Sequence, residues 1–440
     1  MKMNMTKTML ALTGAALMAL GAVADPTITI SRIQQRYPWN GYVDIDYTVA
    51  GVPEGQEGDY YVQFTVSNDV TKTSFVLDNF ADDSRLAFAS NGTWRATWRS
   101  GAMPVERFLA RNVEFKAAVM FDPGCNGART PYRMIKYLVI DLTEGPEATS
   151  YPISTEYYEN TGASQELANV KYNADEYKTN KLVLRRILRG TFTMGSPTTE
   201  TGRQLVNWMN KETQHEVTLT KDYYIGVFPV TQTQWLKVMG GTNPSSYKGN
   251  TDAATCPVEM VSYQMIRGAT KGIAVPITGE VDAGSFLKLL RDKTGLTDLD
   301  LPTEAQWEYA TRAGTTDSTY FGNNVTADAT LLKAHIWYNG NSASKTHGVG
   351  QFPSNPWGLY DTLGNVWEWC RDRVTVAPSH DLGSAAATDP LSEVSNGNGT
   401  LRGGDWYNDA TSSRSACRAG DTAVSGTTVN CGFRLSRPLP

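Results

Sequence analysis

The sequence has few of the side chains that metal and redox sites need. Its 440 residues include four histidines and five cysteines. No Cys-x-x-Cys pair occurs and the histidines stand far apart, so the ligand spacing of a zinc site is missing. The histidines are His215, His335, His347 and His380, and the cysteines are Cys125, Cys256, Cys370, Cys417 and Cys431. A zinc-dependent function is disfavoured, and each histidine is interpreted as a surface or loop residue.

Dense runs of lysine and arginine are also missing, and the formal net charge is -5 at pH 7. A nucleic-acid binder needs a basic surface that neutralises phosphates, so no nucleic-acid partner is expected. After residue 24 no apolar run is long enough to cross a bilayer. The sequence therefore predicts no membrane-spanning segment in the mature chain.

The first residues, MKMNMTKTMLALTGAALMALGAVADPT, have the pattern of a signal peptide. Lys2 and Lys7 precede a short apolar stretch, and Ala22 and Ala24 form the small-x-small pattern that signal peptidase accepts. Removal of residues 1–24 would give a secreted, periplasmic or cell-surface protein. Exported proteins can keep disulfides, so at least one intramolecular disulfide is expected, with the pairing left open. Its candidate members are Cys256, Cys370, Cys417 and Cys431.

Residues 25–143 are predicted to form an all-β sandwich of the immunoglobulin-like kind. Runs such as GYVDIDYTVA and DYYVQFTVS alternate apolar and polar residues, and turn residues separate them. In YVDIDYTV, Val43, Ile45 and Tyr47 fall on one face of the strand. The run KYLVIDLT is interpreted as the last strand of this domain. Because no catalytic constellation occurs here, the domain is interpreted as a spacer or adhesion module.

Residues 144–181 are poor in aliphatic side chains and are interpreted as an extended linker to a second domain, residues 182–440. This domain contains clear helix signals. In PVTQTQWLKVMG, Thr231 is placed to cap a helix, and Thr303 repeats the pattern in LPTEAQWEYATRAG. Another helix is predicted over residues 285–293, within what is interpreted as a surface elaboration.

The second domain resembles the formylglycine-generating enzyme, or sulfatase-modifying factor, family. The resemblance rests on a series of motifs in the order of that family and covers most of the domain. It implies an α+β fold of the C-type lectin-like kind with much irregular structure. The motifs are LVLRRILRGTFTMGSP, HEVTLTKDYYIGVFPVTQTQWLKVMG, NPSSYKG, CPVEMVSY, LPTEAQWEYATRAGT, NPWGLYDTLGNVWEWCRD, LRGGDWYNDA and CGFRLSRP.

The activity of that family is an oxidation for which two cysteines hold copper(I). Counted from the glycine pair that ends at Gly404, the resemblance places these cysteines at Asn408 and Ser413. An amide and a hydroxyl do not replace thiolates as ligands of a soft cation. Copper is therefore not expected, and catalysis is disfavoured without being excluded. Cys417 falls where the family has a structural cysteine.

The resemblance also implies a calcium site in DTLGNVWEWC. A hard cation needs converging oxygens, which a carboxylate and the carbonyls of a tight turn can supply. The alternative is that Glu368 pairs with an arginine. The implied calcium ligands are Asp361, Gly364, Val366 and Glu368.

The segment DWYNDATSSRS mixes aromatic and small polar residues, as antibody paratopes do. A loop that is merely solvated has a similar composition, which stays an alternative. The sequence thus predicts a non-catalytic protein that binds an extracellular protein or glycan. The alternatives are a formylglycine-generating oxidase-type enzyme that acts on sulfatase cysteines, and a structural or adhesion protein that binds through its sandwich. The candidate ligand contacts are Trp406, Tyr407, Asn408, Asp409, Ser413 and Arg414.

Overall fold

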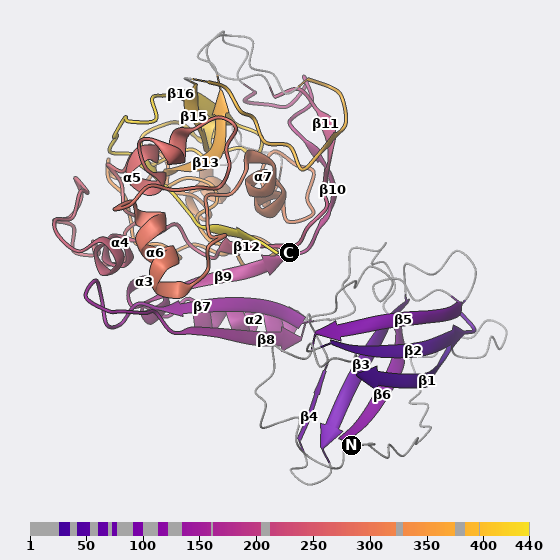
Figure 1. Ribbon diagram of the computed structural model, residues 1–440. Coiled ribbons are helices and arrows are strands. Elements are labelled where there is room, and N and C mark those ends of the chain that lie inside the picture. Colours follow the sequence, from indigo (N-terminus) through magenta and orange to yellow (C-terminus); the bar gives the residue numbers. More distant parts are fainter. Residues whose placement is uncertain are drawn as a thin grey trace. The chain divides into compact units, whose positions relative to one another are not determined.

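The computed structural model divides the chain into two compact units, Met1–Met134 and Ile135–Pro440 (Figure 1). Each unit has a core of its own. The predicted signal peptide, residues 1–24, and Cys125 lie outside the described residues. The structure describes residues 26–35, 42–52, 60–68, 73–76, 91–99, 113–121, 134–159, 162–203, 212–322, 329–374, 383–395 and 397–439.

The described strands of the first unit form two antiparallel sheets that share one core. Val43, Ile45 and Tyr47 point inward and are at most 5% exposed. The ring of Tyr47 lies 5.2 Å from that of Phe64 in the other sheet. The predicted strand alternation and the sandwich are confirmed for the described strands. One sheet has the order β1 (Thr27–Gln35), β2 (Tyr42–Ala50), β5 (Gly92–Arg99), and the other β4 (Thr73–Val76), β3 (Tyr60–Asn68), β6 (Val113–Phe121).

The described strands of the second unit form three sheets, with helices packed around them (Figure 1). The first sheet has the order β18 (Ser436–Pro438), β12 (Tyr223–Gly226), β9 (Lys181–Ile187), β7 (Met134–Asp141), β8 (Ile153–Glu159). The second has the order β16 (Arg418–Thr422), β15 (Asn398–Arg402), β13 (Trp367–Val374), β17 (Cys431–Gly432). The third has the order β10 (Gly190–Met194), β11 (His215–Leu219), β14 (Ala387–Thr388).

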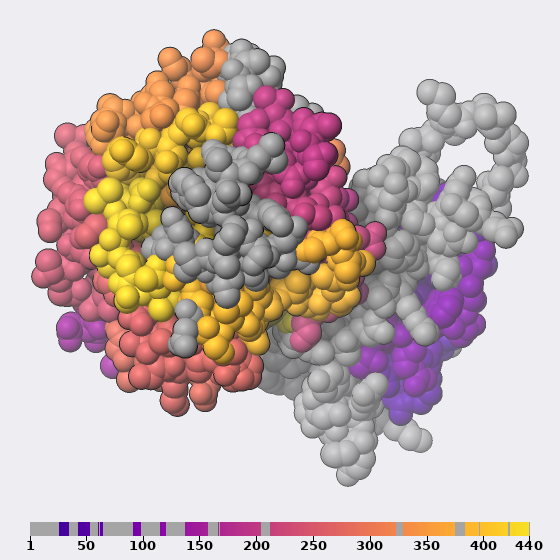
Figure 2. Space-filling model, turned by 90° about the horizontal axis from the view of Figure 1, so that it is seen from above, coloured from indigo at the N-terminus to yellow at the C-terminus, as the bar shows by residue number. Residues whose placement is uncertain are grey.

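The helices of the second unit are short. None of the helices in the described ranges is both long and apolar enough to cross a bilayer. In the space-filling view, the C-terminal segment (yellow) lies beside residues near position 200 (magenta), so segments distant in sequence share one face (Figure 2). The helices are α2 (Gly162–Tyr172), α3 (Glu176–Thr179), α4 (Gln232–Met239), α5 (Tyr263–Arg267), α6 (Phe286–Thr294), α7 (Glu304–Arg312) and α8 (Ala329–Lys333), with 3-10 turns η4 (Lys271–Ile273) and η5 (Ala410–Ser412).

The five-stranded sheet is buried on both faces. Along β9, Leu184 belongs to one core while Val183 and Ile187 belong to the other. This follows from the alternation of side chains along a strand. Helix α2 covers the second of these cores through Tyr172 (Figure 1). The sheet therefore separates two hydrophobic layers of the second unit.

The structure differs from the predicted domain boundary at residue 143. The run KYLVIDLT belongs mainly to β7, which pairs with β9 in the second unit. Residues 137–140 are all buried, because layers cover both faces of this strand. A sandwich strand with one solvent face alternates instead. The unbroken apolar run was thus the signal of a central strand in the larger unit.

The segment predicted as an extended linker, residues 144–181, is folded into the second unit. It contributes β8, α2 and α3. Tyr172 and Tyr177 are 1% and 4% exposed, and the ring of Tyr172 lies 4.2 Å from that of Tyr137. The apolar surface that this segment buries is largely tyrosine. The low aliphatic content of residues 144–181 was therefore a wrong indication of an extended linker, because tyrosines supply the buried apolar surface.

The three helices predicted from capping signals are present. Thr231 and Thr303 begin α4 and α7 with complete capping boxes. Ser285 caps α6, whose Phe286 stacks on Trp235 at 5.2 Å between ring centroids. Helix α6 therefore belongs to the main core, which corrects its interpretation as a surface elaboration.

The expected disulfide is not formed among the described residues: Cys256, Cys370, Cys417 and Cys431 are all buried, and no disulfide joins any two of them. Strand order explains part of this. Cys417 precedes β16 and Cys431 begins β17, so they lie at opposite edges of the four-stranded sheet. Three strand spacings amount to about 14 Å, twice the roughly 7 Å that a disulfide can span.

A chain that begins at residue 182 should fail to fold, whereas one that begins at residue 135 should fold. The shorter chain loses β7, which pairs with β9 along residues 137–141, and loses α2, which covers the adjacent core. We expect cooperative thermal unfolding by circular dichroism for residues 135–440 only. A cooperative transition in the shorter chain would show that residues 144–181 are dispensable.

Candidate functional site

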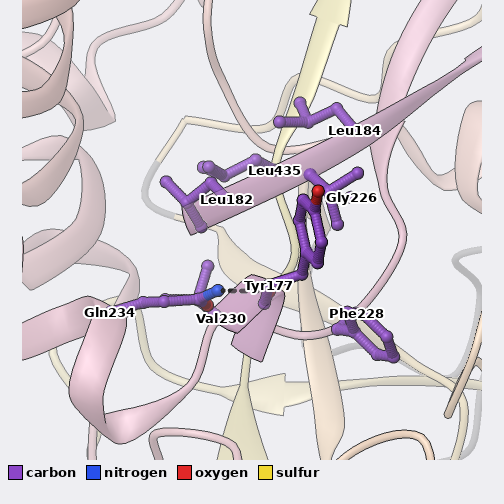
Figure 3. A pocket seen from close by; sticks show the side chains of 9 residues that line it. Tyr177, Leu182, Leu184, Gly226, Phe228, Val230, Gln234 and Leu435 are labelled. Carbon is purple, nitrogen blue, oxygen red and sulfur yellow. Dashed lines mark hydrogen bonds between the residues drawn. The ribbon is translucent and has the colours of Figure 1, made fainter. Parts of the chain in front are cut away.

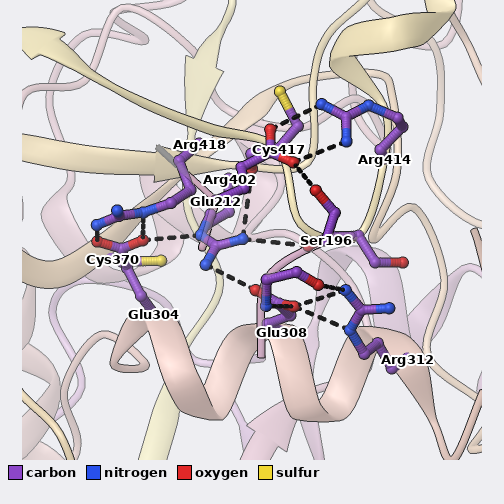
Figure 4. Close-up of polar contacts among 12 residues, drawn as sticks. Ser196, Glu212, Glu304, Glu308, Arg312, Cys370, Arg402, Arg414, Cys417 and Arg418 are labelled. Atoms are coloured by element: carbon purple, nitrogen blue, oxygen red, sulfur yellow. Dashed lines mark hydrogen bonds and ion pairs between the residues drawn. The ribbon is translucent and has the colours of Figure 1, made fainter. Parts of the chain in front are cut away.

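A buried network of ion pairs lies beneath the candidate site (Figure 4). Arg402, at the end of β15, is fully buried and donates to Glu304 and Glu308 of α7, at 2.9 Å in both cases. Arg418 of β16 donates to Glu304 at 2.6 Å. Burial alone would raise the pKa of Glu304, but Arg418 and Arg402 outweigh it and hold that pKa at about 2. If α7 moved away from the sheet, these ion pairs would break and leave buried charges uncompensated, which is strongly destabilising. The network therefore holds α7 against the sheet.

Directly after Arg402 the chain turns through Gly403 and Gly404, whose φ angles are +99° and +75°. A Cβ at Gly404 would lie 2.5 Å from Oγ of Ser413 and 2.8 Å from the carbonyl oxygen of Ser412. Only glycine fits such a conformation in so little space. The glycine pair therefore sets where the following loop, residues 405–413, meets the sheet.

Asp405 fixes the backbone of this loop. Its carboxylate accepts from the backbone N–H groups of Tyr407 (3.2 Å) and Asn408 (2.7 Å), and from the side-chain amide of Asn430. The residue is fully buried, and burial raises the pKa of its carboxyl group. Asp405 was not among the predicted site residues. An aspartate whose side chain bonds N–H groups two and three residues later is a known turn signal, and it stands in GGDWYN.

Tyr407 is an exposed predicted contact, with 66% of the residue accessible. Its neighbour Trp406 is only 5% exposed, and the two rings lie 5.5 Å apart. Trp406 also meets Tyr247 edge-on at 5.3 Å and donates from Nε1 to the carbonyl oxygen of Val429 at 3.2 Å. Tyr407 thus stands out from a loop whose other aromatic residue is part of the packed interior.

Asn408 and Asp409 reach the surface beside Tyr407. Asn408 is half-buried, and its carbonyl oxygen accepts from the N–H of Asn339 at 3.0 Å. Asp409 is exposed, and its side chain accepts from the N–H of Thr411 at 2.9 Å, which caps η5. Of the six predicted contacts, Tyr407, Asn408 and Asp409 are therefore accessible.

Ser413 and Arg414 are fully buried, which corrects their prediction as ligand contacts. Arg414 donates to Glu212 at 2.7 and 2.8 Å and to Glu200 at 2.6 Å. Figure 4 shows this guanidinium directed at Glu212. Together with Trp406, these residues support the loop from inside. The polar sequence SSRS predicted an exposed segment. The carboxylates that pair with Arg414 lie some 200 residues earlier in the chain, so the sequence near Arg414 did not indicate its burial.

The predicted copper positions hold no sulfur. Asn408 offers an amide and Ser413 a hydroxyl whose Oγ is buried without a partner among the described residues. Nearby in sequence, Cys417 is buried, and burial raises the pKa of its thiol to about 12. Copper(I) prefers thiolates, and a buried thiol of high pKa does not supply one at neutral pH. These residues do not fit copper.

The predicted calcium residue Glu368 is paired with an arginine, which was the alternative from the sequence. Its carboxylate accepts from Nε and Nη2 of Arg434, at 2.6 Å in both cases, and from Nε1 of Trp307 at 2.7 Å. Nη2 of Arg434 also donates to the carbonyl oxygen of Asp361 at 3.1 Å. One guanidinium thus contacts both carboxyl-bearing residues of the predicted site and compensates the charge of Glu368.

Asp361 and Gly364, two of the other predicted calcium ligands, also have protein partners. Oδ2 of Asp361 accepts from the N–H of Gly350 at 2.7 Å, and burial raises the pKa of this carboxyl to about 6. The carbonyl oxygen of Gly364 accepts from the N–H of Val366 at 2.9 Å. Within the described ranges, no group of three or more acidic, histidine or cysteine side chains is placed to hold a metal. The carboxylates of Asp361 and Glu368 are thus engaged by protein donors, and the calcium assignment stays a prediction.

A small cavity lies elsewhere in the second unit, beside the five-stranded sheet (Figure 3). Its volume is about 10 Å³, which is roughly the space that the centre of one water molecule needs. A drug-sized ligand does not fit in this cavity. The cavity is lined by Tyr177, Leu182, Val183, Leu184, Gly226, Phe228, Val230, Gln234 and Leu435.

The motifs and the geometry agree with a comparison to known families. Residues 169–439 match the model of the sulfatase-modifying factor enzyme 1-like domain. The chain belongs to this family. The predicted α+β organisation, with a C-type lectin-like domain rich in irregular structure, is thereby confirmed.

Three relatives illustrate the range of the family. The chain is 46% identical over 77 residues to the formylglycine-generating enzyme of Mycobacterium tuberculosis, covering 16% of this chain and 25% of that protein. It is 33% identical over 147 residues to the inactive Cα-formylglycine-generating enzyme 2 of Bos taurus, covering 31% and 43%. It is 32% identical over 188 residues to chaperone protein LppX of Paenibacillus barcinonensis, covering 35% and 63%. The chain thus spans less than two thirds of each relative.

Two solved structures are similar to the chain. Treponema denticola variable protein 1 is 28% identical, with a TM-score of 0.46 over 59% of this chain and 96% of that one. PvdO from Pseudomonas aeruginosa is 26% identical, with a TM-score of 0.45 over 58% and 94%.

Removing divalent cations should leave the stability of the protein unchanged, because Arg434 already compensates the charge of Glu368. We expect thermal unfolding curves with and without EDTA to coincide. Glu368→Gln should lower the free energy of unfolding by about 3–5 kcal/mol, since it leaves Arg434 buried without a counter-charge. A melting temperature that falls on chelation in the wild type, but not in Glu368→Gln, would restore the calcium assignment.

Proposed function

We propose that the protein is an exported, non-catalytic recognition protein that binds its ligand through the surface around Tyr407. The observation that supports this is a tyrosine with 66% exposure on a loop whose backbone a buried aspartate holds. A rigid aromatic side chain offers a large contact area at a small cost in conformational entropy. Export rests on the signal-peptide pattern of residues 1–24.

The surroundings of Tyr407 suit an interface with a central aromatic residue and a polar rim. Asn408 and Asp409 follow it in the loop, and Asn339 is exposed next to Asn408. Val429, 38% exposed, lies on the segment that accepts the Trp406 hydrogen bond. Extracellular proteins and glycans both present groups that such aromatic, amide and carboxylate side chains contact, and these are the ligand classes we propose.

The oxidase function is the second candidate, because the relative from M. tuberculosis carries the name of a formylglycine-generating enzyme. The relative from B. taurus is named as inactive, so family membership alone does not separate the two functions. Asn408 and Ser413 favour the non-catalytic function, since neither supplies a thiolate for copper(I).

Tyr407→Ala should weaken ligand binding at least tenfold, as loss of a central aromatic contact commonly does. The measurement is binding of the labelled full-length protein to a glycan panel and to cell surfaces. The matched control is Val170→Ala, which removes a side chain of similar exposure, 74%, from the distant helix α2. Wild-type binding by Tyr407→Ala would remove the support for this surface and favour an adhesion role of the first unit.

The purified protein, given copper(I), oxygen and a reductant, should not convert the cysteine of a Cys-x-Pro-x-Arg peptide to formylglycine. Mass spectrometry of the peptide measures this. The double variant Asn408→Cys, Ser413→Cys should also bind copper(I) poorly, because residue 413 is fully buried against Gly404 and lacks room for a metal. Turnover by the wild-type protein would overturn the non-catalytic proposal.

A further inference from the structure

Arg185 occupies an unusual position for a charged residue. It lies in the middle of β9, the central strand of the five-stranded sheet, and is 7% exposed. Its cross-strand neighbours are Tyr137 on β7 and Ile225 on β12. Side-chain alternation places it with Val183 and Ile187, on the face that α2 covers (Figure 1). The guanidinium therefore enters a layer built almost wholly of apolar and tyrosine side chains.

Within the described part of the chain, this guanidinium has no counter-charge. Its Nε and Nη1 atoms are buried and have no hydrogen-bond acceptor. Burial lowers the pKa of Arg185, and the one group that opposes this effect is the phenol of Tyr137. The next residue, Arg186, lies on the opposite face of the sheet and donates to Asp222 at 2.9 Å.

Other buried arginines of the second unit have acceptors. Arg402, Arg414 and Arg434 pair with glutamates at 2.6–2.9 Å. Arg373 donates to the carbonyl oxygens of Ile273 and Gly397. An uncompensated charge in a protein interior is strongly destabilising, whereas an apolar side chain of similar volume would be tolerated in its place. Arg185 differs from these arginines, because Nε and Nη1 of its buried guanidinium have no acceptor among the described residues.

We propose that Arg185 is the binding residue of a site for a small carboxylate, in the layer between the five-stranded sheet and α2. The planar N–H groups of a guanidinium match the two oxygens of a carboxylate. The occupant is small, because Tyr137, Val183, Ile187 and Ile225 around it are at most 4% exposed. The site is separate from the surface around Tyr407 and does not depend on its function.

The probe is sodium formate, exchanged for sodium chloride at constant ionic strength, with the melting temperature of the full-length protein as the readout. A ligand that binds only the folded state raises this temperature in a saturable way, here by about 2 °C at tenfold excess over its dissociation constant. Arg185→Met should abolish the rise. Arg185→Lys should reduce it, because an ammonium keeps the charge without the planar donors.

Arg186→Met is the matched control. It removes the neighbouring guanidinium from the opposite face of β9, so the formate response should survive whatever the change in baseline stability. The proposal is overturned if formate does not raise the melting temperature of the wild type, or if Arg185→Met responds as the wild type does. Formate binding to the wild type by calorimetry, with Arg185→Lys as comparison, decides the question if Arg185→Met does not fold.

Discussion

The buried charge of Arg402 is compensated by ion pairs with two glutamates of α7, Glu304 and Glu308. This constraint places α7 across the four-stranded sheet and, through Trp307 of the same helix, beside Glu368. Glu368 in turn pairs with Arg434, which donates to the carbonyl oxygen of Gly226 on β12. Two buried arginines, Arg402 at the end of β15 and Arg434 between β17 and β18, thus join the second unit's two larger sheets through one helix. A domain with little regular structure obtains a fixed geometry in this way, because each guanidinium has directional donors.

The loop that carries Tyr407 begins directly after Arg402. Trp406 and Ser413 of this loop, and Arg414 directly after it, belong to the packed interior, whereas residues 407–409 reach the surface. Within one short segment, some side chains therefore pack the loop against the interior and others are exposed at the surface. Asp405 and Arg414 each satisfy several partners through buried side chains, whereas the Tyr407 side chain is largely exposed. Such a division allows a surface to be altered without refolding the domain.

Local signals predicted the local elements well. The caps at Thr231 and Thr303 predicted two helices because a capping box is complete within four residues, and alternation in YVDIDYTV predicted which face of β2 is buried. Contacts between segments that are far apart in the sequence could not be predicted from local patterns. KYLVIDLT is a central strand only because layers from elsewhere in the chain cover both its faces. The tyrosines of residues 144–181 pack on strands they do not adjoin in sequence. The burial of Arg414 depends on Glu212, two hundred residues away. The sequence motifs identified the family domain, but the partners of its buried ion pairs could be identified only from the three-dimensional structure.

The burial of Cys256, Cys370, Cys417 and Cys431 limits the thiol chemistry of the folded protein. Its second unit is held by hydrophobic layers and arginine–glutamate pairs, none of which depends on the redox potential of the surroundings. Burial raises the pKa of Cys256 and Cys417 to about 12, so these thiols exchange slowly with disulfides in solution. These thiols therefore take little part in disulfide exchange while the second unit is folded.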